Sequence, residues 1–84
     1  MKQIKNDVLV RAIAIVFKRL REKTGLSQEK VMDDLKIDKG LSLHVGRLET
    51  AKINPTISTI DALCVYYNIS LSNFFKLVEK EIQG

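Results

Sequence analysis

Apolar residues recur at three- and four-residue steps along almost the whole chain, in short runs separated by residues that end helices. This spacing is typical of amphipathic α-helices, because positions three and four apart lie on one helix face. No stretch shows the apolar–polar alternation of a half-buried β-strand. We therefore expect an all-α fold. The 84 residues suffice for one domain, residues 1–84, because a second would be too small to bury its own core.

Capping and helix-breaking residues divide the first half of the chain into three predicted helices. The first begins near Asn6, a suitable N-cap, and ends at Lys23, before a Thr-Gly pair. Ser27 is a good N-cap for the second. Residues 36–40 are polar and contain Gly, so we expect a turn there. The third helix is then predicted to start near Ser42.

Two more helices are predicted in the second half. Residues 53–55 end the third helix, because the residue before proline is biased away from helix. Thr56 or Ser58 caps the fourth helix, and Ser70 or Ser72 caps the fifth. The expected fold is thus five short helices joined by tight connections.

The basic residues are unevenly distributed. The net charge of +4 suits a nucleic-acid-binding protein, although charge alone proves little. Residues 1–23 hold seven basic residues and two acidic ones, whereas residues 24–52 hold five of each. The positive field is therefore expected to come mainly from the first helix.

The sequence offers little of what an enzyme, a metal site or a membrane protein needs. One cysteine, Cys64, and one histidine cannot form a disulfide or a zinc site, and they suit a reducing cytoplasm. There is no nucleophile–base pair and no phosphate-binding loop, so we expect no enzyme activity, cofactor or small-molecule ligand. The apolar run 8–17 contains Arg11 and is about half the ~20 residues that span a bilayer, so no membrane contact is expected.

Three fragments in order resemble one known family. They are Phe17-Lys-Arg-Leu-Arg-Glu-Lys-Thr-Gly-Leu-Ser-Gln-Glu29, Gly46-Arg-Leu-Glu-Thr-Ala-Lys-Ile-Asn-Pro55 and Ile60-Asp-Ala-Leu-Cys-Val-Tyr-Tyr-Asn-Ile-Ser-Leu-Ser-Asn-Phe74. Together they resemble the Cro/CI-like (XRE-type, phage lambda repressor-like) helix-turn-helix DNA-binding domains, over about residues 13–75. The resemblance implies a five-helix fold that presents its third helix to the DNA major groove.

The resemblance also implies which side chains meet the DNA. Gln28 matches a residue of the second helix that clamps a phosphate. Asn54 and Thr56 match a loop that touches the DNA backbone, and Arg21 with Glu49 matches a structural ion pair between the first and third helices. The outward positions of the recognition helix are matched by Ser42, Leu43, His44 and Arg47.

Each DNA contact has a plainer alternative. Arg47 could fork onto a guanine, touch a phosphate, or be a solvated surface arginine. Ser42 could be only a cap, and Leu43 could meet a thymine methyl or, as we prefer, pack into the turn. His44 and Gln28 could be ordinary surface residues.

Three features depart from the family's pattern and bear on the angle of the third helix. The chain between Gln28 and Arg47 is about three residues longer than the usual tight turn, so we expect a lengthened turn between helices two and three. Met32 stands where the family has a small alanine, and Ala51 replaces a glycine that ends the recognition helix.

The function that these features favour is a sequence-specific regulator of transcription, repressor-like and cytoplasmic, that binds double-stranded DNA as a homodimer. Extra apolar positions on the terminal helices suggest a dimer contact there; they are Val10, Ala14, Ile15, Val78 and Ile82. The alternative is a helix-turn-helix scaffold used as a protein-interaction module, antitoxin-like, without sequence-specific DNA binding.

Overall fold

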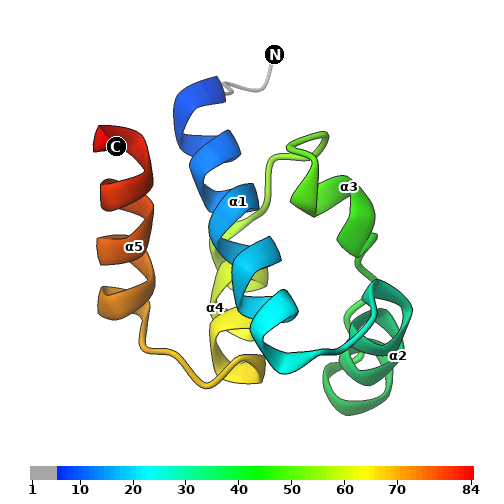
Figure 1. Ribbon diagram of the computed structural model, residues 1–84. Helices are drawn as coiled ribbons and strands as arrows, with labels where there is room; N and C mark the ends of the chain where they lie inside the picture. Colours follow the sequence, from blue (N-terminus) through cyan, green and yellow to red (C-terminus); the bar gives the residue numbers. More distant parts are fainter. Residues whose placement is uncertain (1–5) are drawn as a thin grey trace.

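The computed structural model describes residues 6–84, and that part of the chain is helical without any β-strand (Figure 1). Its elements in chain order are α1 (Asp7–Thr24), α2 (Gln28–Lys39), α3 (Val45–Glu49), α4 (Ile57–Tyr66) and α5 (Leu71–Gln83). The expected all-α, five-helix architecture is confirmed.

Asparagine, serine or threonine side chains cap four of the five helices among the described residues. Asn6, Ser27, Thr56 and Ser70 each accept a hydrogen bond from the backbone N–H three residues further on, at 3.0–3.1 Å. Such a cap satisfies one of the N–H groups that the first turn leaves without a partner. Of the alternatives at α4 and α5, the caps are therefore Thr56 and Ser70.

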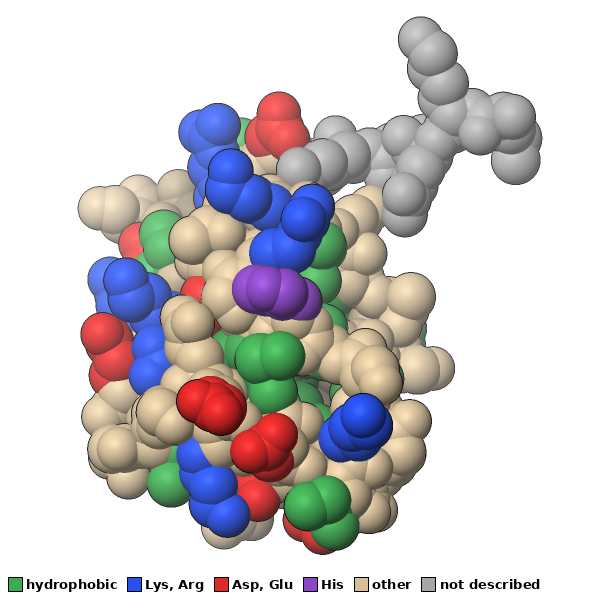
Figure 2. Space-filling view, turned by 90° about the vertical axis from the view of Figure 1, so that its right-hand side faces the viewer, with side chains coloured by type: hydrophobic (Ala, Val, Ile, Leu, Met, Phe, Trp, Pro, Cys, Tyr) green, Lys and Arg blue, Asp and Glu red, His purple; other side chains and the backbone are tan. Residues whose placement is uncertain are grey.

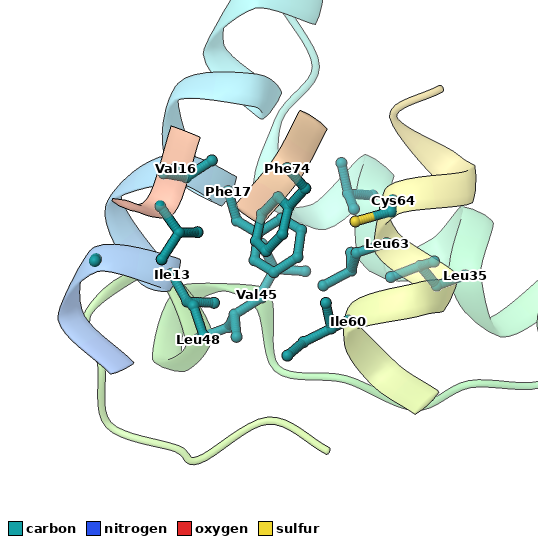
Figure 3. Packing of buried hydrophobic residues seen from close by; sticks show 13 residues of the cluster. Ile13, Val16, Phe17, Leu35, Val45, Leu48, Ile60, Leu63, Cys64 and Phe74 are labelled. Atoms are coloured by element: carbon teal, nitrogen blue, oxygen red, sulfur yellow. The ribbon is translucent and has the colours of Figure 1, made fainter. Parts of the chain in front are cut away.

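One hydrophobic core draws on all five helices (Figure 3). At its centre the ring of Phe17 from α1 stacks on that of Phe74 from α5, with centroids 4.4 Å apart. Leu35 of α2 and Leu63 of α4 are completely buried, and Val45 of α3 is 1% exposed. The inner faces that helical spacing predicts therefore meet in one core.

The helices lie on two sides of α1. Figure 1 shows α5 along one side of α1, with α2 and α3 on the other. Helix α3 contacts both α1 and α2, and the described residues span 33 × 32 × 20 Å. As a result α3 lies at the edge of the molecule remote from α5 (Figure 1).

The predicted turn at 36–40 and the helix start near Ser42 are both wrong. Helix α2 continues to Lys39 and ends at Gly40, which has a left-handed φ of 62°. There the N–H of Gly40 donates to the carbonyl of Lys36, and the N–H of Leu41 to that of Leu35, both at 3.1 Å. The bond from Gly40 to Lys36 is the 5→1 bond of an αL cap, which requires a residue that tolerates positive φ, so the glycine rather than the polar run before it ends the helix.

The lengthened connection between α2 and α3 is the loop 40–44, which ends in the N-cap of α3, His44. Leu41 and Leu43 in this loop are partly buried against the core. Because these two side chains hold the loop in a non-helical course, α3 begins only at Val45.

Candidate nucleic-acid interface

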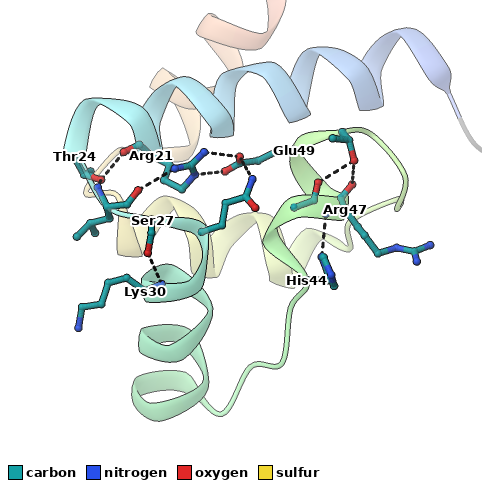
Figure 4. A network of polar contacts seen from close by, with 11 residues as sticks. Arg21, Thr24, Ser27, Lys30, His44, Arg47 and Glu49 are labelled. Carbon is teal, nitrogen blue, oxygen red and sulfur yellow. Dashed lines mark hydrogen bonds and ion pairs between the residues drawn. The ribbon is translucent and has the colours of Figure 1, made fainter.

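Helix α3 is short, with five residues, and its two faces differ sharply. Val45 and Leu48 are each 1% exposed and anchor the inner face in the core. Arg47 is exposed and extends away from the rest of the molecule (Figure 4). The buried inner face therefore fixes the position of α3, and the outer face presents the long polar side chain of Arg47.

A polar network ties the end of α3 to α1 (Figure 4). Arg21 donates from Nε to Glu49 Oε2 at 2.7 Å and from Nη2 to Glu49 Oε1 at 2.9 Å. Its Nη1 donates to the carbonyl oxygen of Leu26 at 2.9 Å. The hydrogen bond to Glu49 raises the pKa of Arg21 above its ordinary value. Both side chains are largely buried, with 13% of Arg21 and 2% of Glu49 exposed.

Gln28 joins the same network from the first turn of α2. Its Nε2 donates to Glu49 Oε1 at 3.0 Å, so one carboxylate receives donors from two other helices. The residue is exposed overall, and its amide nitrogen carries a second N–H that can donate outward. The structure therefore places Gln28 as a brace between α2 and α3 at the surface where a phosphate clamp is expected.

Gly46 allows α2 and α3 to approach closely. An added Cβ at this position would lie 3.1 Å from Gln28 Oε1 and 3.4 Å from His44 Cε1. A larger side chain at this position would therefore press on the side chains of Gln28 and His44. The sequence contained the signal, a glycine inside a predicted helix, but its role was missed.

Two predicted contact residues, Ser42 and Leu43, lie on the loop before α3 rather than on the helix. Leu43 is partly buried against the core, in agreement with packing into the lengthened turn. Ser42 is exposed and is not the cap. Both line a shallow hollow in front of α3, together with Met32, Asp33, Lys36 and His44.

His44 caps α3. Its Nδ1 accepts a hydrogen bond from the backbone N–H of Arg47 at 3.1 Å, while the side chain is exposed (Figure 4). Histidine is not among the preferred N-caps, so propensity gave no reason to expect it here.

The remaining predicted residues lie beyond α3. Thr56 is exposed and caps α4, with its Oγ1 accepting from the N–H of Thr59 at 3.1 Å. Asn54 is half-buried and lines a groove with Asn6 and Leu9 near the start of α1. Neither residue shares the hollow in front of α3.

The face that carries α2 and α3 has mixed charge. Figure 2 shows Lys and Arg side chains gathered around and above the chain's single histidine, with acidic side chains below it. Asp33 and Lys36 line the hollow beside His44. A polyanion would meet a favourable field over the α3 end of this face and a weaker one over α2.

A second polar link, which sequence reasoning missed, holds α2 against α4. The hydroxyl of Tyr66 donates to Asp34 Oδ2 at 2.7 Å, and Lys30 Nζ lies 2.9 Å from Asp34 Oδ1. The hydrogen bond from Tyr66, followed by that from Lys30, lowers the pKa of Asp34. Burial and the same hydrogen bond raise the pKa of Tyr66 to about 12.

Within residues 6–84 no group of three or more His, Cys, Asp or Glu side chains could hold a metal ion. None of the described helices is both long and apolar enough to cross a membrane.

Comparison with known families gives one match. The family model described as a helix-turn-helix domain matches residues 12–73, which covers α2, α3 and α4, most of α1 and only the start of α5. Comparisons with curated proteins and with solved structures give no match. Families of this kind bind DNA and are typically not enzymes. The resemblance that the three sequence fragments indicate is confirmed, and the chain belongs to the helix-turn-helix domain family.

Proposed function

We propose that this protein is a sequence-specific regulator of transcription that binds double-stranded DNA by placing α3 in the major groove. The observation that carries the proposal is the mounting of α3. Its inner face is buried, its end is tied to α1 by Arg21 and Glu49, and Arg47 remains exposed on its outer face. A rigid mount matters because base readout needs side chains held in register with the base edges.

Under this proposal, each side chain around α3 has its own role in DNA binding. Arg47 reads a base edge, and guanine N7 and O6 match its fork. The second N–H of Gln28 contacts a phosphate beside the N-terminus of α2, where the helix dipole also favours an anion. Ser42 and His44 approach the DNA from the loop, Asn54 and Thr56 touch the backbone further along, and Leu43 supports the loop.

We also propose that two copies act together. Val10, Ala14 and Val78 are buried, so these three cannot form the dimer contact suggested by the sequence. Ile15 and Ile82 are 39% and 45% exposed and line one hollow between α1 and α5. The hollow also includes Arg11 and Glu81, but Glu81 already pairs with Arg19 of the same chain, so the proposed contact rests on the two isoleucines. Helix α5, which forms one wall of this hollow, lies on the other side of α1 from α3, which leaves α3 free for DNA (Figure 1).

We also propose the extent of the domain and the compartment in which the protein acts. We treat residues 1–84 as one DNA-binding domain, because the five helices share one core. A DNA ligand and the buried free thiol of Cys64 suit a reducing compartment, and we propose the cytoplasm.

The test is duplex binding measured as a function of salt. The proposal predicts affinity for mixed duplex DNA at low salt that falls linearly on a log–log plot as salt rises. Arg47→Ala should reduce discrimination between sequences and, because it removes a charge, flatten the salt slope, whereas Gln28→Ala should weaken binding to all sequences alike and leave the salt slope unchanged. Unchanged DNA binding in both variants would show that the assigned residues are not the site.

A second candidate function rests on the acidic part of the same face (Figure 2). Acidic side chains there would favour a basic protein partner, as in an antitoxin-like interaction module. Absence of duplex binding even at low salt would favour this second function over the first.

A further inference from the structure

We infer that His44 contacts DNA as a hydrogen-bond donor through Nε2, because capping of α3 uses Nδ1 and so fixes the tautomer of the ring. The inference rests on the proposed function and deepens it, since it names the chemistry of one contact and the kind of DNA atom that the contact selects.

The first step is the identity of the atom that caps the helix. His44 has the extended backbone of an N-cap residue, with φ −84° and ψ 94°, and its Nδ1 accepts the N–H of Arg47 at 3.1 Å. An acceptor nitrogen carries no proton. A neutral imidazole has one N–H, so in the capped state the proton is on Nε2.

The second step is where the other nitrogen lies. Nδ1 faces the backbone of α3, and Nε2 is on the far side of Cε1 in the ring. Cε1 comes 3.4 Å from the position of an added Cβ on Gly46, so a glycine there lets the ring rest against the first turn of α3. The side chain is exposed, and no hydrogen bond between described residues uses Nε2.

The side chains around His44 favour contact with an anionic ligand. Figure 2 places the histidine beside gathered Lys and Arg side chains on the face that presents α3. Arg47, whose N–H is capped, is three residues further on and carries the main proposed base contact. An N–H held at this point meets acceptors on DNA: a purine N7, guanine O6, thymine O4 or a phosphate oxygen.

A fixed donor discriminates because it cannot also accept. Cytosine offers only its N4 amino donor in the major groove, so it gives no partner to Nε2–H. If His44 faces a base edge, the favoured bases are purines and thymine, and cytosine is rejected. If it faces a phosphate, the contact adds affinity without sequence preference.

The decisive variants separate capping from DNA contact. His44→Asn keeps a strong N-cap but shortens the side chain, whereas His44→Ala removes both functions. We expect His44→Asn to unfold at or above the wild-type temperature and to bind selected duplexes about 2- to 10-fold more weakly, the range for one neutral hydrogen bond. His44→Ala should lose both stability and affinity. Wild-type affinity and specificity in His44→Asn would show that the histidine is only a cap, and would overturn the inference.

Two further measurements complete the test. The ¹⁵N spectrum of the imidazole in free protein should show Nδ1 unprotonated and Nε2 protonated, and the opposite tautomer would contradict the inference whether or not DNA binds. Replacement of guanine by 7-deazaguanine at successive operator positions should reproduce the His44→Asn loss at one position if a guanine N7 is the acceptor. A wild-type protein that binds no duplex at all, with the expected tautomer, would instead refute the proposed function and the DNA contact with it.

Discussion

The guanidinium of Arg21 holds the carboxylate of Glu49 with two hydrogen bonds of 2.7 and 2.9 Å, although 28 positions separate the two residues in the chain. Since Glu49 is the last residue of α3, this pair sets how the end of α3 sits on α1. Gln28 adds a third donor to the same carboxylate. The stability of the fold and the proposed DNA contact therefore depend on the same buried side chain.

Glu49→Gln should destabilise the fold, because the variant leaves the largely buried guanidinium of Arg21 without a countercharge. We expect a loss of about 3 kcal/mol in the free energy of unfolding, measured with urea. Glu79→Gln makes the same chemical change at an exposed position of α5 and should cost little. Equal stabilities of the two variants would contradict a structural role for the pair.

Ala51→Gly should stabilise the protein. Ala51 has a φ of 59°, in the left-handed region that side chains with a Cβ disfavour, just after α3. Relief of this strain, less the extra flexibility of glycine in the unfolded chain, should add roughly 0.5–1 kcal/mol. Asn68→Gly is the matched control, because Asn68 has a similar φ of 56° but asparagine tolerates it. An Ala51→Gly variant less stable than wild type would show that the methyl group contributes more than the strain costs.

Acid should weaken the link between α2 and α4. Because hydrogen bonds from Tyr66 and Lys30 lower the pKa of Asp34 below its ordinary value of 3.8, the folded state favours the carboxylate. The resulting stability is present above pH 3.8 and is lost as the pH falls through the lower pKa of the folded state. Asp34→Asn should therefore be less stable than wild type at neutral pH and should lose less stability as the pH falls. Urea midpoints measured across the acid range check this. Asp38→Asn, an exposed change on the same helix, should keep the wild-type pH profile.

Ile82→Asp should produce monomers. The change removes an apolar side chain from the hollow that Ile82 shares with Ile15 and places a like charge beside Glu81, and both effects oppose association. Sedimentation should show the wild type dimerising with concentration and the variant remaining monomeric, with weaker operator binding. Ile37→Asp is the control, because Ile37 is 80% exposed on α2 and lies outside that hollow. A wild-type mass that stays monomeric at every concentration would remove the dimer from the account.

Local signals predicted most of the fold. The caps Asn6 and Ser27 and the spacing of apolar residues predict where helices begin and which faces are buried, because both act within one or two turns. The start of α3 was placed wrongly, because the choice between Ser42 and His44 as cap depends on how Leu41 and Leu43 pack against the core. Such packing is tertiary and leaves no short-range pattern.

The candidate site was less predictable for the same reason. Arg21 and Glu49 were paired through the family resemblance, since no spacing rule joins residues so far apart. The bonds from Gln28 to Glu49 and from Tyr66 to Asp34 also cross between helices, and neither was expected. Ala51, by contrast, stood out in the sequence as a replacement for glycine, and its positive φ gives that departure a physical meaning.

Selection of bound duplexes from a random pool tests the central claim most directly. The account predicts enrichment of a short near-palindromic motif, with half-sites about one DNA turn apart, and loss of preference at one position per half-site in Arg47→Ala. A pool that remains random after repeated selection with the folded protein at low salt would contradict the claim that α3 reads DNA.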